Sequence, residues 1–288
     1  MAMRLGVLML GTGAHAAACV GVMAELAKRQ VEPYAVCGMH AGAWPAALHV
    51  AGQDAQAMHA SVAQAARMGK RLLQPNVSAG KILRHGRLAM TDGMRVQRLL
   101  SAQAGQRILA LCPRQGLFLC RTARSGHLLI FSTQAYVQQA GAMLNMQASV
   151  SFAARAAMAY PPFLPPVEWM GSPLLAEEDA ALACRQLLAM GAHRVLVIAP
   201  QPSSRRRLDA LDLTALSRRW NGEDVMPERT GILRVPMPDD AGALCFGRLS
   251  ACEEAGRRAA ELELDRLFEQ MGMAFCRVLP FRRSGMQG

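Results

Sequence analysis

A pattern repeated near the N-terminus constrains the fold most: a short apolar run, a glycine turn, then a segment of small residues. It occurs first in residues 4–18, RLGVLMLGTGAHAAA, and again in residues 34–47, YAVCGMHAGAWPAA. Apolar runs bounded by glycine are typical of buried strands, and small-residue segments favour helices that pack closely. We therefore predict two successive strand–turn–helix units, which is the building pattern of a parallel sheet.

The same alternation continues along the chain. A hairpin is expected in residues 107–122, with its turn at Arg114-Gln115-Gly116. The other predicted strands are 4–10, 34–39, 127–133 and 193–200, and the predicted helices are 17–29, 40–50, 54–68, 94–103, 149–159, 182–190 and 245–269. This order predicts an α/β fold with a mainly parallel central sheet flanked by helices, in one domain over residues 1–288. Residues 200–232 are Arg-rich and poorly periodic, so we expect a surface excursion there.

The first residues have two interpretations. Arg4, the apolar run and the small residues after it resemble a short signal peptide. The competing interpretation is a buried first strand followed by a glycine loop and a helix. We favour the strand, because the segment fits the repeated pattern.

The net charge of +11 and the pI of about 9.9 come almost entirely from arginine. Such a surface attracts anions, and we expect peripheral contact with an anionic membrane. The competing interpretation is a compositional bias, with the arginines solvated singly. No aromatic interleaving or nucleic-acid motif accompanies the charge, so a nucleic-acid partner is not expected. The basic clusters are residues 203–207, 218–219, 257–258 and 282–283.

The chain has eight cysteines and no Cys-x-x-Cys pair. Most lie in apolar segments, which favours buried free thiols in a reducing cytoplasm. The seven histidines show no zinc-type spacing with the cysteines, so neither a metal nor another cofactor is predicted.

The first glycine turn allows two functions. Gly11, Gly13 and Ala16 match Gly-x-Gly-x-x-Ala, the loop that carries a pyrophosphate in dinucleotide-binding folds. That function also requires an acid at the end of the second strand, and the second strand ends in VCGMH without one. The other function is an oxyanion hole, in which backbone N–H groups of Gly11-Thr12-Gly13-Ala14-His15 stabilise a developing alkoxide.

The second turn, Gly38-Met39-His40-Ala41-Gly42, has the spacing of a nucleophile elbow with histidine at the position of the nucleophile. With the glycine loop, the order of these segments resembles the patatin-like phospholipases. The resemblance continues through TDGMRVQRLL, RAAMAYPPFLPPVEWMG, GAHRVLVIAP and FGRLSACEEAGRRAA, and so covers almost the whole chain. It implies a three-layer α/β fold and a metal-free Ser–Asp dyad that hydrolyses acyl esters.

This sequence departs from that family where the chemistry lies. His40 replaces the elbow serine, and His15 stands for the basic residue of the loop. Counted from both sides, the acid of Asp-Gly-Gly falls at Leu175 or Ala176. The nearest acidic residues, one to a few positions away, are Glu177, Glu178 and Asp179.

Two hypotheses follow from these departures. In the first, the chain is a catalytically degenerate member that binds an acyl or lipid ligand, or a protein partner, and keeps Gly38 and Gly42 because the tight turn needs them. In the second, His40 attacks an ester or activates water, with Glu177 as its orienting acid and the Gly11–Gly13 loop as oxyanion hole.

Overall fold

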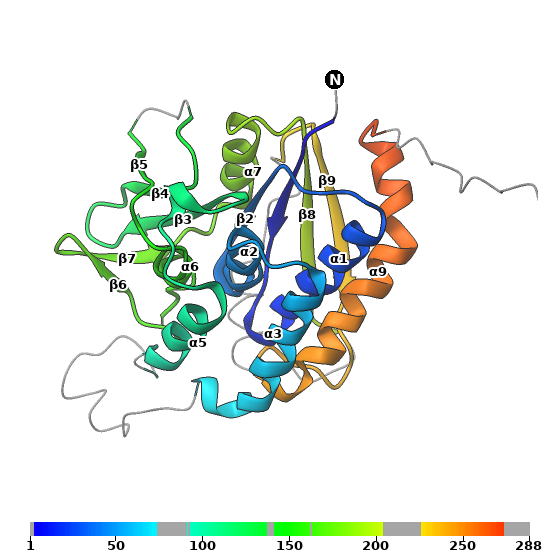
Figure 1. The fold of residues 1–288 in the computed structure, drawn as a ribbon, viewed down its shortest axis with the longest axis horizontal. Helices are drawn as coiled ribbons and strands as arrows, with labels where there is room; N and C mark the ends of the chain where they lie inside the picture. Colours follow the sequence, from blue (N-terminus) through cyan, green and yellow to red (C-terminus); the bar gives the residue numbers. More distant parts are fainter. Residues whose placement is uncertain are drawn as a thin grey trace, which may run out of the picture.

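The computed structural model describes residues 3–73, 91, 93–136, 141–161, 163–203 and 226–273. Figure 1 shows a central sheet with helices packed on it. The strands are β1 (Leu5–Met9), β2 (Ala35–Gly38), β3 (Gln115–Thr122), β4 (Leu128–Ser132), β5 (Met143–Asn145), β6 (Val167–Trp169), β7 (Ser172–Ala176), β8 (Arg194–Gln201) and β9 (Thr230–Pro236).

The helices follow the strands in the predicted alternation. The α-helices are α1 (Ala17–Lys28), α2 (Ala43–Val50), α3 (Ala55–Met68), α5 (Met94–Ala104), α6 (Val150–Ala157), α7 (Ala180–Ala189) and α9 (Leu249–Gln270). The short 3-10 helices are η1 (Gly13–Ala16), η2 (His40–Gly42), η3 (Gly69–Leu73), η4 (Leu109–Leu111) and η5 (Phe246–Arg248).

The sheet is mixed, and its centre is parallel. Its strand order is β5-β4-β3-β2-β1-β8-β9, and β3, β2, β1, β8 and β9 pair in parallel. Strand β4 is antiparallel to β3, and β7 pairs antiparallel with both β3 and β6. This arrangement confirms the predicted α/β fold with a mainly parallel central sheet flanked by helices.

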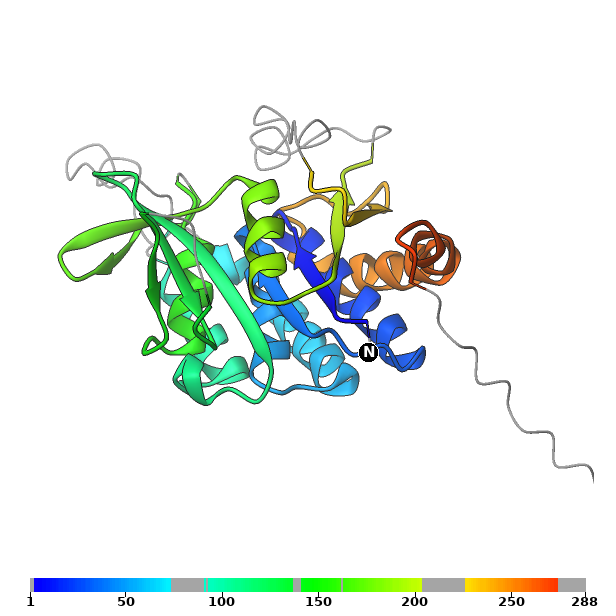
Figure 2. The same cartoon turned by 90° about the horizontal axis from the view of Figure 1, so that it is seen from above.

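Side-chain alternation along β1 divides the core into two layers. Leu5, Val7 and Met9 pack with the helices α1, α2, α3 and α9 on one face. Leu8 packs on the other face, with Ala183 and Leu187 of α7. Figure 2 shows α7 on one side of the sheet and the α1–α3 layer on the other. Both faces of the central strands are therefore covered, as a parallel sheet requires.

Two predictions about the elements were wrong, and one hairpin was not predicted. Residues 109–111 form η4 instead of a strand, because Leu109 N–H and Ala110 N–H donate to the carbonyls of Ala148 and Met146 in the segment before α6. The predicted turn residues Gln115 and Gly116 lie inside β3. The β6–β7 hairpin was missed, because its strands are too short to show a period.

The predicted excursion at residues 200–232 also needs correction. Strand β8 continues to Gln201, and β9 begins at Thr230 as a parallel neighbour of β8. The remainder of the excursion, residues 204–225, lies outside the described residues. Alternating burial along β9 shows the period of a strand, but its weak apolar content hid that period in the sequence.

The buried thiols match the prediction for the cysteines that the structure describes. These seven are free, and Cys19, Cys37, Cys120, Cys184 and Cys252 are buried. Burial raises the pKa of Cys184 and of Cys252 to about 12, so both thiols stay protonated at neutral pH. Within the described part of the chain, no helix combines the length and the apolar character that a membrane span requires.

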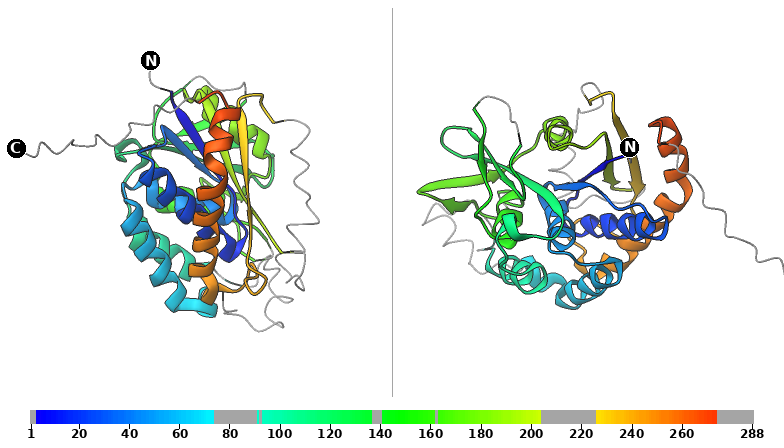
Figure 3. Two further views of the ribbon diagram at one scale, coloured as in Figure 1. Left: turned by 90° about the vertical axis from the view of Figure 1, so that its right-hand side faces the viewer. Right: turned by 45° about the horizontal axis from the view of Figure 1, so that its top comes forward.

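Helices α1 and α9 cross at two glycines, beside the sheet edge formed by β9 (Figure 3). A Cβ at Gly21 would lie 1.9 Å from the carbonyl oxygen of Glu253, and a Cβ at Gly256 would lie 1.9 Å from that of Ala18. Since both obstacles are backbone atoms, neither helix can carry a side chain at the crossing without moving apart from the other.

We therefore expect Gly256→Ala to lower the free energy of unfolding by about 2–3 kcal/mol, as overpacked sites do. The gain in helix propensity, about 1 kcal/mol, is smaller than this cost. Gly247→Ala is the matched control, because a Cβ there meets nothing within 4 Å. Denaturant unfolding of the two variants checks the expectation, and equal stabilities would contradict it.

His49 is a buried polar residue on α2. It is 3% exposed, and its Nε2 has no hydrogen-bond partner among the described residues. Burial, with a smaller contribution from Arg114, lowers the pKa of His49 to about 3. The imidazole is therefore neutral in the folded protein at every pH above that value.

This buried imidazole makes stability depend on pH. Between the folded pKa and the unfolded value of about 6.5, the unfolded chain binds the extra proton, so stability falls as pH falls. From pH 7 to pH 5 we expect the wild type to lose about 2 kcal/mol through this group, and His49→Leu to remove that loss. Urea unfolding at the two pH values measures the difference, and an unchanged pH slope in the variant would contradict the assignment.

Candidate functional site

The elbow lies between β2 and α2, where the chain reverses direction within four residues. A Cβ at Gly42 would lie 2.1 Å from the carbonyl oxygen of Met9, and one at Gly38 would lie 2.4 Å from Ala43 Cα. Only glycine allows these backbone approaches, which explains both elbow glycines. Met39 N–H donates to Met9 O at 3.0 Å, so the elbow is also bonded to the end of β1.

His40 occupies the centre of the elbow in a left-handed backbone conformation, with φ of +49°. For a residue with a side chain this conformation costs about 1–2 kcal/mol, and such strained positions cluster at functional sites. The imidazole is half-buried and meets the ring of Tyr160 edge-on, with the centroids 5.1 Å apart and the planes at 86°. The backbone thus presents His40 as an elbow presents a nucleophile.

The glycine loop packs directly against the elbow. A Cβ at Gly11 would lie 3.0 Å from the amide nitrogen of Gly42, and Ala41 N–H donates to Gly11 O at 3.1 Å. The structure therefore brings together the two turns that the sequence predicted as one site. The hydrogen bond from Ala41 to Gly11 engages the amide that follows the elbow residue. In hydrolases with this turn, that amide donates to the oxyanion.

The loop is held from its other side by the segment between β9 and α9. Ala14 N–H donates to Ala243 O at 2.7 Å, and the buried ring of His15 is bonded through Nε2 to Ala241 O at 3.0 Å. His15 N–H donates to Thr12 O at 3.1 Å. The amides of Ala14 and His15 are thus engaged within the protein, which removes two donors that an oxyanion or a pyrophosphate would use.

The predicted acid position is linked to the elbow through residues 159 and 160. At the end of β7, Ala176 N–H donates to Ala159 O at 2.9 Å, and the next residue after Ala159 is Tyr160, which contacts His40. Leu175 and Ala176 pair with Arg121 and Cys120 of β3, beyond the point where β2 ends. The position at which the sequence resemblance predicts an acid thus carries the apolar side chains of Leu175 and Ala176.

Glu177 is the nearest carboxylate along the chain, and one of its oxygens is hydrogen-bonded while the other faces an arginine. It is 4% exposed, and Oε1 accepts from the N–H groups of Glu178 and Asp179 at 2.8 and 3.0 Å. Oε2 forms an ion pair with Arg121 but accepts no hydrogen bond from the described residues. Asp179 in turn caps α7 by accepting from Leu182 N–H at 2.8 Å. These acids hold the start of α7 in place.

No group of three histidine, cysteine, aspartate or glutamate side chains is placed to hold a metal ion within the described parts of the chain. Sequence reasoning missed two parts of the site, namely Tyr160 and the Ala241–Ala243 segment. The tyrosine stands directly before a proline-rich run, which signals a fixed loop but not its contact. The segment between β9 and α9 carries no local signal, because its role depends on backbone carbonyls.

Comparison with known proteins gave no match to a protein-family model and none to a curated protein sequence. Among solved structures, the chain is similar to VipD from Legionella pneumophila, with 11% identity and a TM-score of 0.48 over 90% of this chain and 67% of VipD. It is similar to the type III effector ExoU, with 15% identity and a TM-score of 0.43 over 94% of this chain and 54% of ExoU.

A third similar structure is human GIVD cytosolic phospholipase A2 in complex with methyl gamma-linolenyl fluorophosphonate. Its identity is 13% and its TM-score 0.45, over 94% of this chain and 59% of the human enzyme. The chain thus spans between about half and two thirds of the length of these structures.

The left-handed conformation of His40 gives a testable consequence for stability. Both His40→Gly and His40→Ala lose the ring contact with Tyr160, but only the glycine variant also removes the backbone strain. We expect the glycine variant to be about 1 kcal/mol more stable than the alanine variant, the reverse of the usual order of these residues. Urea unfolding of the pair decides it, and a more stable alanine variant would show that the elbow relaxes.

Proposed function

We propose that this chain is a catalytically degenerate patatin-like protein, whose elbow site binds an acyl or lipid ligand, or a protein partner, without cleaving an ester. The observation that carries the proposal is the apolar acid position, Leu175 and Ala176, together with Glu177 bound to Arg121 and the start of α7. The elbow geometry remains, but the side chains that would supply a nucleophile–acid pair are replaced.

The proposal rests on how strongly hydrolysis depends on that pair. A serine nucleophile needs a group that takes its proton, and removing one member of such a unit costs several orders of magnitude in rate. Here both members differ at once. The amides of Ala14, His15 and Ala41 give further support, because they are hydrogen-bonded within the protein and stabilising an oxyanion needs donors aimed at it.

A second candidate function is ester hydrolysis by His40 itself. The strained conformation of His40 favours it, since chains retain such strain where the side chain is used. An imidazole can attack an ester or activate water when it is neutral and oriented. This function requires an orienting acid, and Glu177 would have to leave Arg121 to serve as one.

The two functions separate in one assay. Purified wild type, His40→Ala and His40→Ser are compared on p-nitrophenyl butyrate and on a phospholipid, with His127→Ala as control because His127 is an exposed histidine outside the elbow. We expect no turnover above buffer from any of the four, including His40→Ser, since the acid position would remain apolar. Wild-type turnover that falls at least about 100-fold in His40→Ala, but not in His127→Ala, would establish the hydrolase.

Ligand binding is measured on the same wild-type protein by thermal shift. Saturating oleate or a lysophospholipid should raise the Tm by several degrees, because binding to the folded state alone adds about 2.7 kcal/mol at 100 times Kd. NAD(P) should leave the Tm unchanged, and a shift with NAD(P) alone would favour a nucleotide site at Gly11–Ala16. No shift with any lipid would leave the protein partner as the occupant to identify.

A further inference from the structure

The turn of the β6–β7 hairpin has an unusual composition. Met170 and Gly171 both have positive φ, +49° and +76°, which is the backbone of a two-residue type I′ turn. Asparagine or aspartate normally precedes the glycine in such a turn. Here the residue is methionine, and its side chain is 89% exposed, the highest value among the exposed large apolar residues of the described chain. The turn is thus strained and apolar at once.

The hairpin below the turn is held by aromatic packing. Trp169 packs against Phe131 and Phe152, with ring centroids 5.4 and 5.2 Å apart, and pairs with Ser172 across the hairpin. A cluster of three aromatic rings, of which Phe131 is fully buried, therefore supports the position from which Met170 projects. The exposed apolar side chain of Met170 is thus carried by a well-supported hairpin.

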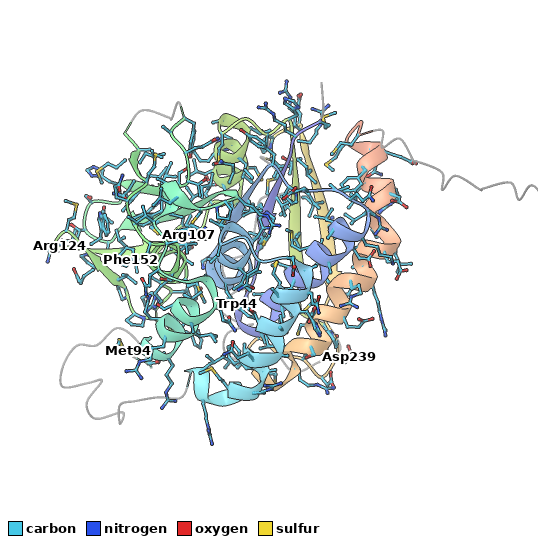
Figure 4. The ribbon with its side chains drawn as sticks, in the orientation of Figure 1. Trp44, Met94, Arg107, Arg124, Phe152 and Asp239 are labelled. Atoms are coloured by element: carbon cyan, nitrogen blue, oxygen red, sulfur yellow. The ribbon has the colours of Figure 1, made fainter. Side chains whose placement is uncertain are left out.

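A second turn lies beside the hairpin. Ala123 N–H donates to Pro173 O at 2.7 Å, which joins the β3–β4 turn to the start of β7. Residues 123–127 are exposed, among them Arg124, which Figure 4 places at the same end of the molecule as β6 and β7. Met143, which is 50% exposed, pairs with Leu129 just after this turn. We call Arg124, Met143 and Met170 the tip surface.

The segment of the sequence that contains the tip surface is rich in arginine and poor in acidic residues. Between residues 93 and 176 the only acidic residue is Glu168, which is exposed on β6 opposite Pro173. Glu177, just outside this range, is buried and paired with Arg121. The arginines of the same stretch are Arg95, Arg98, Arg107, Arg114, Arg121, Arg124 and Arg155.

The tip surface also lies at the end of the sheet where β2 leads into the elbow. Strand β3 runs parallel to β2, pairs with it as far as Phe118 beside Gly38, and then continues to Thr122. The β3–β4 turn therefore follows the carboxyl end of a strand whose neighbour ends in the elbow.

From these observations we propose that the tip surface docks on an anionic lipid bilayer. Met170 would enter the boundary between headgroups and acyl chains, and Arg124 would meet the lipid phosphates. Exposed apolar side chains combined with cationic neighbours are what membrane-surface binding uses, because apolar burial and attraction to anionic lipid add together. This inference does not depend on whether the elbow site cleaves or only binds its ligand.

The test is co-sedimentation of the full chain with vesicles of phosphatidylcholine alone or with 30% phosphatidylglycerol. Met170→Asn is the central variant, because asparagine suits a type I′ turn and should keep or raise the Tm. We expect the wild type to bind anionic vesicles and Met170→Asn to weaken that binding about tenfold, as expected for losing one buried methionine. Arg124→Gln should weaken it about fivefold on anionic vesicles only.

Two controls make the result specific. Leu262→Asn removes another exposed apolar residue, 79% exposed on α9, and should leave vesicle binding unchanged. Replacing Arg205, Arg206 and Arg207 with glutamine tests the most basic run of the sequence. The proposal is overturned if the wild type does not sediment with anionic vesicles, if Leu262→Asn weakens binding as much as Met170→Asn, or if only the triple arginine variant loses binding.

Discussion

The approach of two backbone segments at Gly42 and Met9 is the contact on which the rest of the site depends. Because Gly42 has no Cβ, the elbow can lie against the end of β1, and the Met39 and Ala41 amides then bond to Met9 and Gly11. This contact sets the start of α2, joins the glycine loop to the elbow and leaves His40 in a left-handed conformation. A side chain at position 42 would separate all of these at once.

The site therefore separates geometry from chemistry. Its shape is held by glycines and by backbone bonds, such as those from Ala14 to Ala243 and from Ala176 to Ala159. The chemistry would come from side chains, and those at the elbow and at the acid position differ from the dyad that the sequence resemblance implies. A chain can lose catalytic side chains without losing such a scaffold, because the scaffold does not use them.

The acids beside the site illustrate the same separation. Glu177 and Asp179 stand within a few residues of the expected acid, yet Asp179 caps the first turn of α7 and Glu177 accepts from the two amides just before that helix. A carboxylate at a helix N-terminus that is also paired with an arginine is strongly held, so it is poorly suited to orient a neighbouring imidazole. A residue that lies near the expected acid in the sequence can therefore direct its side chain to quite different partners.

The sequence by itself determined β1, α1, β2, α2 and the elbow between them, because apolar period and glycine sterics act over a few residues. It also predicted an acid position at Leu175 or Ala176, which remains a prediction; these residues end β7, where Ala176 N–H donates to Ala159 O, next to Tyr160. Only the tertiary structure decided that the 109–111 segment is a 3-10 helix and that β9 extends the sheet. It also decided that the carbonyl of Ala243 accepts a hydrogen bond from the amide of Ala14. Each of these depends on a partner distant in the sequence, and a backbone carbonyl that accepts a bond leaves no trace in the identity of its residue.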